Sequence, residues 1–391
     1  MLQKFKVKNF KKFNNEIVFD LTKTKKYTFN ESIIKNGVLN TALIYGSNGS
    51  GKSNLGFAIF DIIFHTTDNE KIKEFYNNYL YGNGILENNA RFIYEFKFKD
   101  KNIIYTYSKE NVDKIIEEEL IVDGQRVLYI NREQSDIFLN IQEASSLQIK
   151  NILESNLSLL KYLLTNVPFE KTSIYFELKS YLESMLWFRG LFSSSFLGYR
   201  CEAVSIIDQI LELSKIYKEV NISDTEREEL IKKNLEKFEE FLKEAGVDLK
   251  LNTRILEGTR VLEVEIEAEN INEKRYLNFF HIASSGTLAL ANFYAWYKNL
   301  ENVKLVFIDE FDSFYHHKLS KLIIKKLKEK NETQIILTTH STNLMDNELL
   351  RPDAYFILKN NKIKSLPELT DKELREAHNI EKLFKSGAFD E

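Results

Sequence analysis

The chain has few of the residues that usually mark secreted, repetitive or membrane-spanning proteins. Its 391 residues include one cysteine, three prolines and two tryptophans, and no apolar run approaches the length that crosses a bilayer. Because Cys201 has no partner within the chain, an internal disulfide is excluded, and the first residues lack the apolar core of a signal peptide. With three prolines the chain also has no proline-rich linker. These features predict a cytoplasmic protein with no membrane partner.

The remaining composition is that of an ordinary globular protein. Hydrophobic residues make up 43% of the chain and charged residues 29%, so one large core or two modest ones can form. The net charge of −4 argues against a protein that coats nucleic acid non-specifically. A local basic strip is still compatible with that balance, so nucleic-acid binding stays open.

A glycine-rich loop near the start is the most informative stretch. Residues 46–53, Gly-Ser-Asn-Gly-Ser-Gly-Lys-Ser, fit the pattern GxxxxGK[ST] between an apolar strand-like run and a segment with helical spacing. Backbone N–H groups of such a loop surround phosphate oxygens, Lys52 supplies a charge for the β and γ phosphates, and Ser53 can ligate Mg²⁺. The alternative, a chance glycine-rich turn, fits this context less well. The predicted nucleotide-binding residues are Gly46, Asn48, Gly49, Ser50, Gly51, Lys52, Ser53 and Asn54.

Two further strands end in side chains suited to phosphate chemistry. Residues 304–310 form an apolar run that ends in Asp309 and Glu310, which we assign to Mg²⁺ binding and to activation of the attacking water. A second run, 332–339, ends at His340, whose neutral imidazole could hold the γ phosphate and the water. Each motif alone has a structural interpretation, a solvated acidic turn or a structural histidine. Their occurrence together with the phosphate loop favours a catalytic site.

A Ser-Ser-Gly-Thr turn at residues 284–287 opens a further helix. Its N–H groups and dipole would face outward toward an anion. The turn is a weak signal by itself, and its position 25 residues before Glu310 strengthens it.

The pattern of apolar residues predicts an α/β fold. We expect a mainly parallel sheet with flanking helices, an antiparallel β lobe near residues 90–130 and a compact helical insertion. A capping-box pattern at Ser223 to Glu226 marks the start of one amphipathic helix. The predicted division is 1–140 for the first half of the nucleotide-binding domain with the lobe, 141–250 for the helical insertion and 251–391 for the second half of that domain.

In this order and spacing, the four motifs resemble those of ABC-type ATPases: phosphate loop, signature helix, carboxylate strand and switch histidine. More narrowly, the chain is similar to the AAA15/AAA21 group of RecF- and SMC-related bacterial ATPases. That likeness rests on the opening Asn-Phe-Lys-Lys-Phe at 9–13, the loop at 51–55 and Arg-Pro-Asp at 351–353.

The resemblance implies a P-loop ABC-type head that binds ATP and Mg²⁺ and hydrolyses ATP slowly, with Glu310, His340 and Lys52 as catalytic residues. It also implies an ATP-sandwich dimer, or a higher homo-oligomer, in which Ser285 and Gly286 of one subunit close over the γ phosphate held by Lys52 of the other. Related ATPases include subunits of anti-phage and abortive-infection systems of the PARIS and Septu types. The implied function is to sense an invader or to control a toxic effector, such as a nuclease, encoded nearby.

Two alternatives stay open, and one is disfavoured. A RecF-like, ATP-gated DNA repair protein would touch phosphates through the lysines at 321, 325, 326 and 328, unless these form a solvated helix face. His316 and His317 could be metal ligands, although a subunit contact fits adjacent histidines better. A transporter ATPase is disfavoured because 257 residues separate Lys52 from Asp309.

The chain departs from the family pattern in two respects. Its signature reads Ser-Ser-Gly-Thr where transporter ATPases usually have Ser-Gly-Gly-Gln. The glutamine that normally joins the phosphate site to the inserted lobe is unassigned, with Gln125 and Gln134 as candidates.

Overall fold

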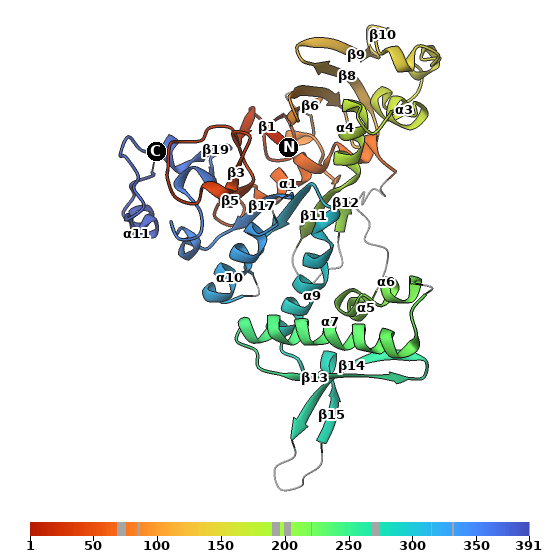
Figure 1. Ribbon diagram of the computed structural model, residues 1–391. Helices are drawn as coiled ribbons and strands as arrows, with labels where there is room; N and C mark the ends of the chain where they lie inside the picture. The colour runs from red at the N-terminus through yellow and green to blue at the C-terminus, as the bar shows by residue number, and fades with distance from the viewer. Residues whose placement is uncertain are drawn as a thin grey trace.

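The computed structural model describes residues 1–68, 76–84, 87–189, 196–198, 205–219, 221–267, 274–313, 315–330 and 332–390. Two seven-stranded sheets lie in the upper part of the molecule, and a three-stranded sheet with its helices lies below them (Figure 1). Within these ranges no helix combines the length and the hydropathy that crossing a membrane would require.

The central sheet is mainly parallel, as predicted. Its order is β12-β11-β16-β17-β5-β18-β19, and the five middle strands run parallel, with β12 and β19 antiparallel at the edges. The middle strands are almost entirely buried, which explains why they read as continuous apolar runs. The strands are β5 (Thr41–Tyr45), β11 (Met185–Arg189), β12 (Phe196–Gly198), β16 (Leu305–Asp309), β17 (Gln334–Thr339), β18 (Tyr355–Lys359) and β19 (Lys362–Ser365).

The second sheet is antiparallel throughout and contains the predicted lobe. Its order, β10-β9-β8-β7-β6-β1-β2, joins the meander near residues 90–130 to the first two strands of the chain. Along β6 buried residues alternate with more exposed ones, so one face belongs to the core. The strands are β1 (Leu2–Lys8), β2 (Ile17–Asp20), β6 (Ala90–Phe98), β7 (Lys101–Lys109), β8 (Ile115–Val122), β9 (Gln125–Asn131) and β10 (Asp136–Leu139), and a separate short pair is β3 (Ile34–Lys35) with β4 (Val38–Leu39).

Helices flank both sheets. Helix α1 packs on the central sheet against β11 and β16, and α3 and α4 pack on the lobe. The helices of this upper part are α1 (Lys52–Phe60), α2 (Ile63–Thr66), α3 (Leu159–Asn166), α4 (Ile174–Glu183), α10 (His317–Lys328) and α11 (Ile380–Lys385). Helix α9 (Ser285–Lys298) runs between the upper and lower parts and packs against α5 and α7 (Figure 1).

The range 141–250, expected to be one helical insertion, is divided between three places. Helices α3 and α4 contact the lobe strands, β11 then pairs with β16 in the central sheet, and the remaining helices join the lower part. Strand β11 has the sequence Met-Leu-Trp-Phe-Arg, and an apolar run this short does not distinguish a strand from a buried helix. The three-part domain division stays a prediction. Strand β11, which lies within the range 141–250, belongs to the central sheet.

The lower part combines a long helix with the three-stranded sheet β13-β14-β15 (Figure 1). The capping box that opens α7 is confirmed, since Ser223 Oγ accepts from Glu226 N and Glu226 Oε2 accepts from Ser223 N. The apolar face of α7 reaches α9, where the Phe238 and Tyr294 rings lie 5.0 Å apart. The elements are α5 (Ile206–Leu211), α6 (Leu213–Lys218), α7 (Asp224–Glu244), β13 (Lys250–Leu256), β14 (Thr259–Glu267), β15 (Lys274–Asn278) and α8 (Phe279–Ile282).

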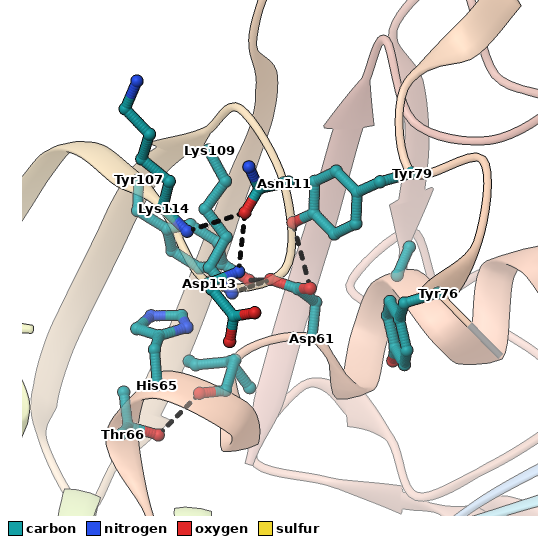
Figure 2. A network of polar contacts seen from close by, with 12 residues as sticks. Asp61, His65, Thr66, Tyr76, Tyr79, Tyr107, Lys109, Asn111, Asp113 and Lys114 are labelled. Atoms are coloured by element: carbon teal, nitrogen blue, oxygen red, sulfur yellow. Dashed lines mark hydrogen bonds and ion pairs between the residues drawn. The ribbon is translucent and has the colours of Figure 1, made fainter. Parts of the chain in front are cut away.

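A buried polar network joins the end of α1 to the antiparallel lobe (Figure 2). Asp61, at the C-terminal end of α1, forms a 2.8 Å ion pair with Lys109 of β7, and both side chains are fully buried. Tyr79 and Tyr107 each donate a hydrogen bond of 3.0 Å to the Asp61 carboxylate. Because the charges are paired and hydrogen-bonded, the network can lie in the core and fix the helix relative to the lobe.

Candidate nucleotide-binding site

The predicted phosphate loop connects β5 to α1. Gly46 N donates to Thr339 O over 3.2 Å, which continues the β5–β17 ladder by one residue before the loop turns. Gly49 and Gly51 have φ angles of +74° and +109°, a region that side chains disfavour. The loop therefore has the strand, turn and helix context that its sequence predicted.

The glycines at both ends of the loop also permit close approaches. A Cβ on Gly46 would lie 2.4 Å from Ser50 Oγ, and one on Gly51 would lie 3.0 Å from the Phe13 ring. Lys12 Nζ donates to the carbonyl of Gly49. The Asn-Phe-Lys-Lys-Phe opening thus lies directly against the loop.

Lys52 lies in the loop and is held there by carbonyl groups. Its Nζ donates to Gly46 O over 2.7 Å and to Ser47 O over 3.3 Å, and the residue is only 4% exposed. Burial lowers the pKa of Lys52, while the negative charges of Glu310, Asp309 and Asp312 act in the opposite direction. Lys52, near the start of the chain, therefore lies close enough to the carboxylates at the end of β16 to interact with them electrostatically.

Strand order accounts for this convergence. Strand β17 lies between β16 and β5, and all three run parallel, so the segments that follow them leave the same edge of the sheet. The loop follows β5, Glu310 follows β16 and His340 follows β17.

Thr338 of β17 holds both residues of the carboxylate motif. Its Oγ1 donates to Asp309 Oδ1 over 2.7 Å and accepts from Glu310 N over 2.8 Å. Asp309 is 2% exposed, whereas Glu310 is partly exposed. The two neighbouring carboxylates therefore face different surroundings.

Glu310 has a left-handed backbone conformation, with φ of +50°. For a residue with a side chain this conformation costs roughly 1–3 kcal/mol and persists only where surrounding contacts enforce it. Here the contacts are the hydrogen bonds of Glu310 N to Thr338 Oγ1 and of Phe311 N to Thr338 O. Strain of this kind is typical of functional sites.

The sequence prediction missed Asp312 and the two threonines. Asp312 is 9% exposed, and its Oδ2 accepts from Thr339 Oγ1 over 2.7 Å. Burial raises the pKa of Asp312, and the nearby His340 partly opposes that effect. His340 itself is exposed at the end of β17. The pair Thr338-Thr339 was a signal in the sequence, because adjacent threonines before the histidine place one hydroxyl on each side of the strand.

The described donors fit a magnesium-bound triphosphate. Ser50 Oγ is buried inside the loop without a hydrogen-bond partner among the described residues. The Lys52 ammonium donates to loop carbonyl oxygens, and phosphate oxygens could replace these as its acceptors. Ser53, in the first turn of α1, and Asp309 supply the oxygen ligands that Mg²⁺ prefers. Of the remaining predicted loop residues, Asn48 and Gly49 are exposed and Asn54 is partly exposed.

Ser285 and Gly286 lie elsewhere in the subunit. They begin α9 next to α8, which contacts β14 and β15 in the lower part, whereas the phosphate loop lies at the central sheet (Figure 1). Ser284 caps the helix, with its Oγ accepting from Thr287 N over 3.2 Å. Ser285 is exposed. Among the contacts of the described residues, none joins this turn to the loop.

The other candidate groups have structural surroundings. His316 caps α10, its side chain accepting from Leu319 N, and the described residues contain no cluster of three or more His, Cys, Asp or Glu side chains suited to a metal. Gln125 and Gln134 are exposed in the lobe. The coupling glutamine therefore stays unassigned.

Three of the four α10 lysines have partners within the chain. Lys321 pairs with Asp346 and Lys326 with Glu244, and Lys328 donates to Asn30 Oδ1 and Leu349 O. Lys325 is exposed. The helix therefore presents less free positive charge than its sequence indicates.

The Arg-Pro-Asp motif at 351–353 is a buried structural unit. Arg351 Nε donates to Asp353 Oδ1 over 2.8 Å, and Asp353 Oδ2 accepts from Lys25 N over 2.6 Å. The motif thus fixes the segment after β2.

Comparison with known proteins gives one family match and several distant structural similarities. Residues 174–346 match a family described as "AAA domain, putative AbiEii toxin, Type IV TA system". The matched range includes Ser285, Asp309, Glu310 and His340, and it does not include the phosphate loop. No curated protein matches the chain significantly.

Three of the similar solved structures are heads of SMC proteins. One is an SmcHead bound to the C-winged helix domain of ScpA, with a TM-score of 0.45 and 15% identity, covering 93% of this chain and 96% of that one. The SMC head domain of Thermotoga maritima gives 0.42 and 15%, covering 93% and 97%. An Smc head with an extended coiled coil, bound to a ScpA domain derived from Pyrococcus furiosus, gives 0.43 and 14%, covering 93% and 95%. Over residues 174–346, the chain is therefore similar to an AAA-type ATPase family.

Proposed function

We propose that this chain is an ABC-type ATPase that binds ATP and hydrolyses it slowly. The observation that carries the proposal is the adjacency of β16, β17 and β5, which directs the phosphate loop, two carboxylates and His340 to one edge of the sheet. The electrostatic contact between Lys52 and Asp309, Glu310 and Asp312 supports the same site. The family match at residues 174–346 supports the same class of protein.

Each residue has a role that follows from its position. Lys52 and the loop N–H groups bind the β and γ phosphates, and Glu310 accepts the proton of the attacking water. His340 orients that water and the γ phosphate. Ser53 and Asp309 would hold Mg²⁺, which supplies charge neutralisation between the phosphates.

We also propose that the site is completed by a second copy of the chain. At the start of α9, Ser285 of the signature turn is exposed and Gly286 is partly exposed, away from the phosphate loop of their own subunit. The N–H groups and dipole at the start of this helix suit an anion, which a second subunit could supply. An ATP-sandwich dimer, or a higher homo-oligomer, would bring this turn to the partner's triphosphate.

The biological role we favour is control of a toxic effector, such as a nuclease encoded nearby, in cytoplasmic defence against phage. The family resemblance and the description of the matched family support this role. A DNA repair function would need a phosphate-binding surface, and the α10 lysines largely have partners within the chain. Duplex binding that weakens steeply with salt would favour the repair alternative.

The ATPase proposal is tested by Glu310→Gln. Loss of the base should lower kcat by about 10²-fold or more, because general-base catalysis contributes about that much, while ATP binding stays within about threefold. The measurements are phosphate release and equilibrium binding of ATP. Glu376→Gln, at an exposed position remote from the site, is the matched control. Brisk turnover by Glu310→Gln would remove Glu310 as the base.

A further inference from the structure

The segment after β16 folds back onto β17. It brings a third carboxylate, that of Asp312, next to the backbone that precedes His340. Phe311 N donates to Thr338 O over 3.2 Å, and Ser313 N donates to Glu310 O over 3.1 Å, so residues 310–313 form a tight turn. The left-handed Glu310 makes this reversal. As a result, the Asp312 side chain points toward the end of β17 instead of continuing along its own strand.

Thr339 joins that carboxylate to the backbone on both sides of His340. Its Oγ1 donates to Asp312 Oδ2 over 2.7 Å and accepts from Ser341 N over 2.9 Å. His340 is the single residue between these two contacts. The carboxylate is therefore fixed relative to the backbone from which the imidazole projects.

The Asp312 carboxylate has a second oxygen, Oδ1, that can still accept a hydrogen bond. Its Oδ1 is buried and has no hydrogen-bond partner in the described part of the chain, which is costly for a carboxylate oxygen. The exposed His340 ring likewise has no hydrogen bond to any described residue. The two side chains are close enough to interact, since His340 opposes the effect of burial on the pKa of the Asp312 carboxyl.

We propose that Asp312 is a positioning residue for His340: when ATP binds, Asp312 Oδ1 accepts a hydrogen bond from one imidazole nitrogen and thereby fixes the ring that contacts the γ phosphate. A carboxylate that holds one ring nitrogen determines the tautomer, so the other nitrogen is presented to the substrate in a defined state. Asp312 itself does not touch the nucleotide. This inference rests on the ATPase function proposed above and adds a residue to its site.

A positioning role differs from a merely structural one in its dependence on His340. Asp312→Asn keeps the size of the side chain and an oxygen that can accept from Thr339, but it loses the charge. We expect kcat to fall about tenfold or more, with KM for ATP within about twofold, because contacts that orient an active-site histidine are worth about that much. In a His340→Gln background the same change should alter kcat by less than about twofold, because Asp312 acts through the ring. Asp371→Asn, at an exposed carboxylate, is the control.

A spectroscopic measurement reports the ring directly. The chain has six histidines, so His340 can be assigned in a ¹⁵N-histidine NMR spectrum by its loss in His340→Gln. In Glu310→Gln protein, which should hold ATP without turnover, addition of ATP and Mg²⁺ should convert His340 to one hydrogen-bonded tautomer. In Glu310→Gln/Asp312→Asn protein that conversion should be absent.

The outcomes separate this inference from the ATPase proposal. Suppose that the wild type binds and hydrolyses ATP. If Asp312→Asn is then as active as the control, or if it lowers kcat by the same factor in the His340→Gln background as in the wild type, Asp312 does not position the ring. The ATPase function would still stand. If the wild type neither binds nor hydrolyses ATP, both proposals fail. If Asp312→Asn does not fold, Thr339→Val removes the contact that fixes the carboxylate. Its kcat should then fall in the wild-type background and not in His340→Gln, and an equal fall in both would overturn the inference.

Discussion

At the scale of single residues, Thr338 shows how one hydroxyl can organise two carboxylates. Its Oγ1 contacts the Asp309 side chain and the Glu310 backbone, and the Asp309 carboxylate is buried whereas Glu310 is partly exposed. These are the two groups that we propose bind Mg²⁺ and activate water. The left-handed conformation of Glu310 is unfavourable for a residue with a side chain, so the surrounding contacts have to enforce it. The local geometry of the site therefore depends on a residue that has no proposed contact with ATP.

A carboxylate kept buried for function should cost stability at neutral pH. Burial raises the pKa of Asp312 above its ordinary value of 3.8, so between 3.8 and the folded pKa the native state binds more protons than the unfolded state. The free energy of unfolding therefore falls as pH rises through this window, and the loss is complete above it. We predict that Asp312→Asn raises the thermal midpoint at pH 7.5 and that this gain shrinks toward pH 4, as measured by calorimetry. The prediction would be wrong if the increase in thermal midpoint did not depend on pH, or if the wild type were more stable than Asp312→Asn at pH 7.5.

The phosphate loop could be predicted from sequence because its residues are local and their roles follow from spacing alone. Asp309, Glu310 and His340 were predictable as strand ends with suitable chemistry. The roles of Thr338, Thr339 and Asp312 could not be predicted in the same way, because they depend on the pairing of β16 with β17 and on the reversal at Glu310. Which strands pair, and where the chain reverses, are tertiary features that local patterns in one sequence do not reveal.

At the scale of elements, helix α1 is fixed at both ends. Its first residues form the phosphate loop, and its last turn joins the lobe through Asp61 and Lys109 (Figure 2). Between them, Gly56 lets the helix approach β16, since a Cβ there would lie 2.8 Å from the Phe307 ring. Movement of the lobe would therefore act on the helix that carries Lys52 and Ser53.

The buried ion pair allows a stability test of this connection. Lys109→Met should destabilise the protein by about 3–5 kcal/mol, because the Asp61 charge stays buried without its counter-charge. Asp61→Asn combined with Lys109→Met should recover much of that loss, because no unpaired charge is left. Urea unfolding of the wild type, both single variants and the double variant measures the coupling. A double variant that loses the sum of the two single losses would show that the charges act independently.

The secondary structure of β11 could not be predicted from the sequence. Its neighbours in the chain have helical spacing, and its five residues form an apolar run compatible with either structure. Pairing with β16 decides the outcome, and β16 lies more than 100 residues later. Long, periodic elements such as α7 were predictable because their patterns extend over several turns.

At the scale of the whole molecule, the proposed dimer depends on the exposed start of α9. Ser285→Arg should prevent ATP-dependent dimerisation of Glu310→Gln protein, because a large cation would occupy the space of the partner's triphosphate. ATP binding by the monomer should change by less than about threefold, since Ser285 lies away from the loop of its own subunit. Light scattering after size-exclusion chromatography measures the mass, and Ser386→Arg is a control at another exposed serine. If Ser285→Arg dimerises normally with ATP, the turn is not part of the interface.

In the proposed site, a loop near the start of the chain and carboxylates from its far end bind one nucleotide. The most direct test is the affinity for ATP, with Mg²⁺ and with EDTA, in the wild type, Lys52→Ala and Asp309→Asn. We predict that Lys52→Ala weakens binding about tenfold or more under both conditions. We predict that Asp309→Asn keeps the Mg²⁺-free affinity and loses the enhancement by Mg²⁺ that the wild type shows. An undiminished Mg²⁺ enhancement in Asp309→Asn would mean that the far carboxylates do not reach the bound triphosphate.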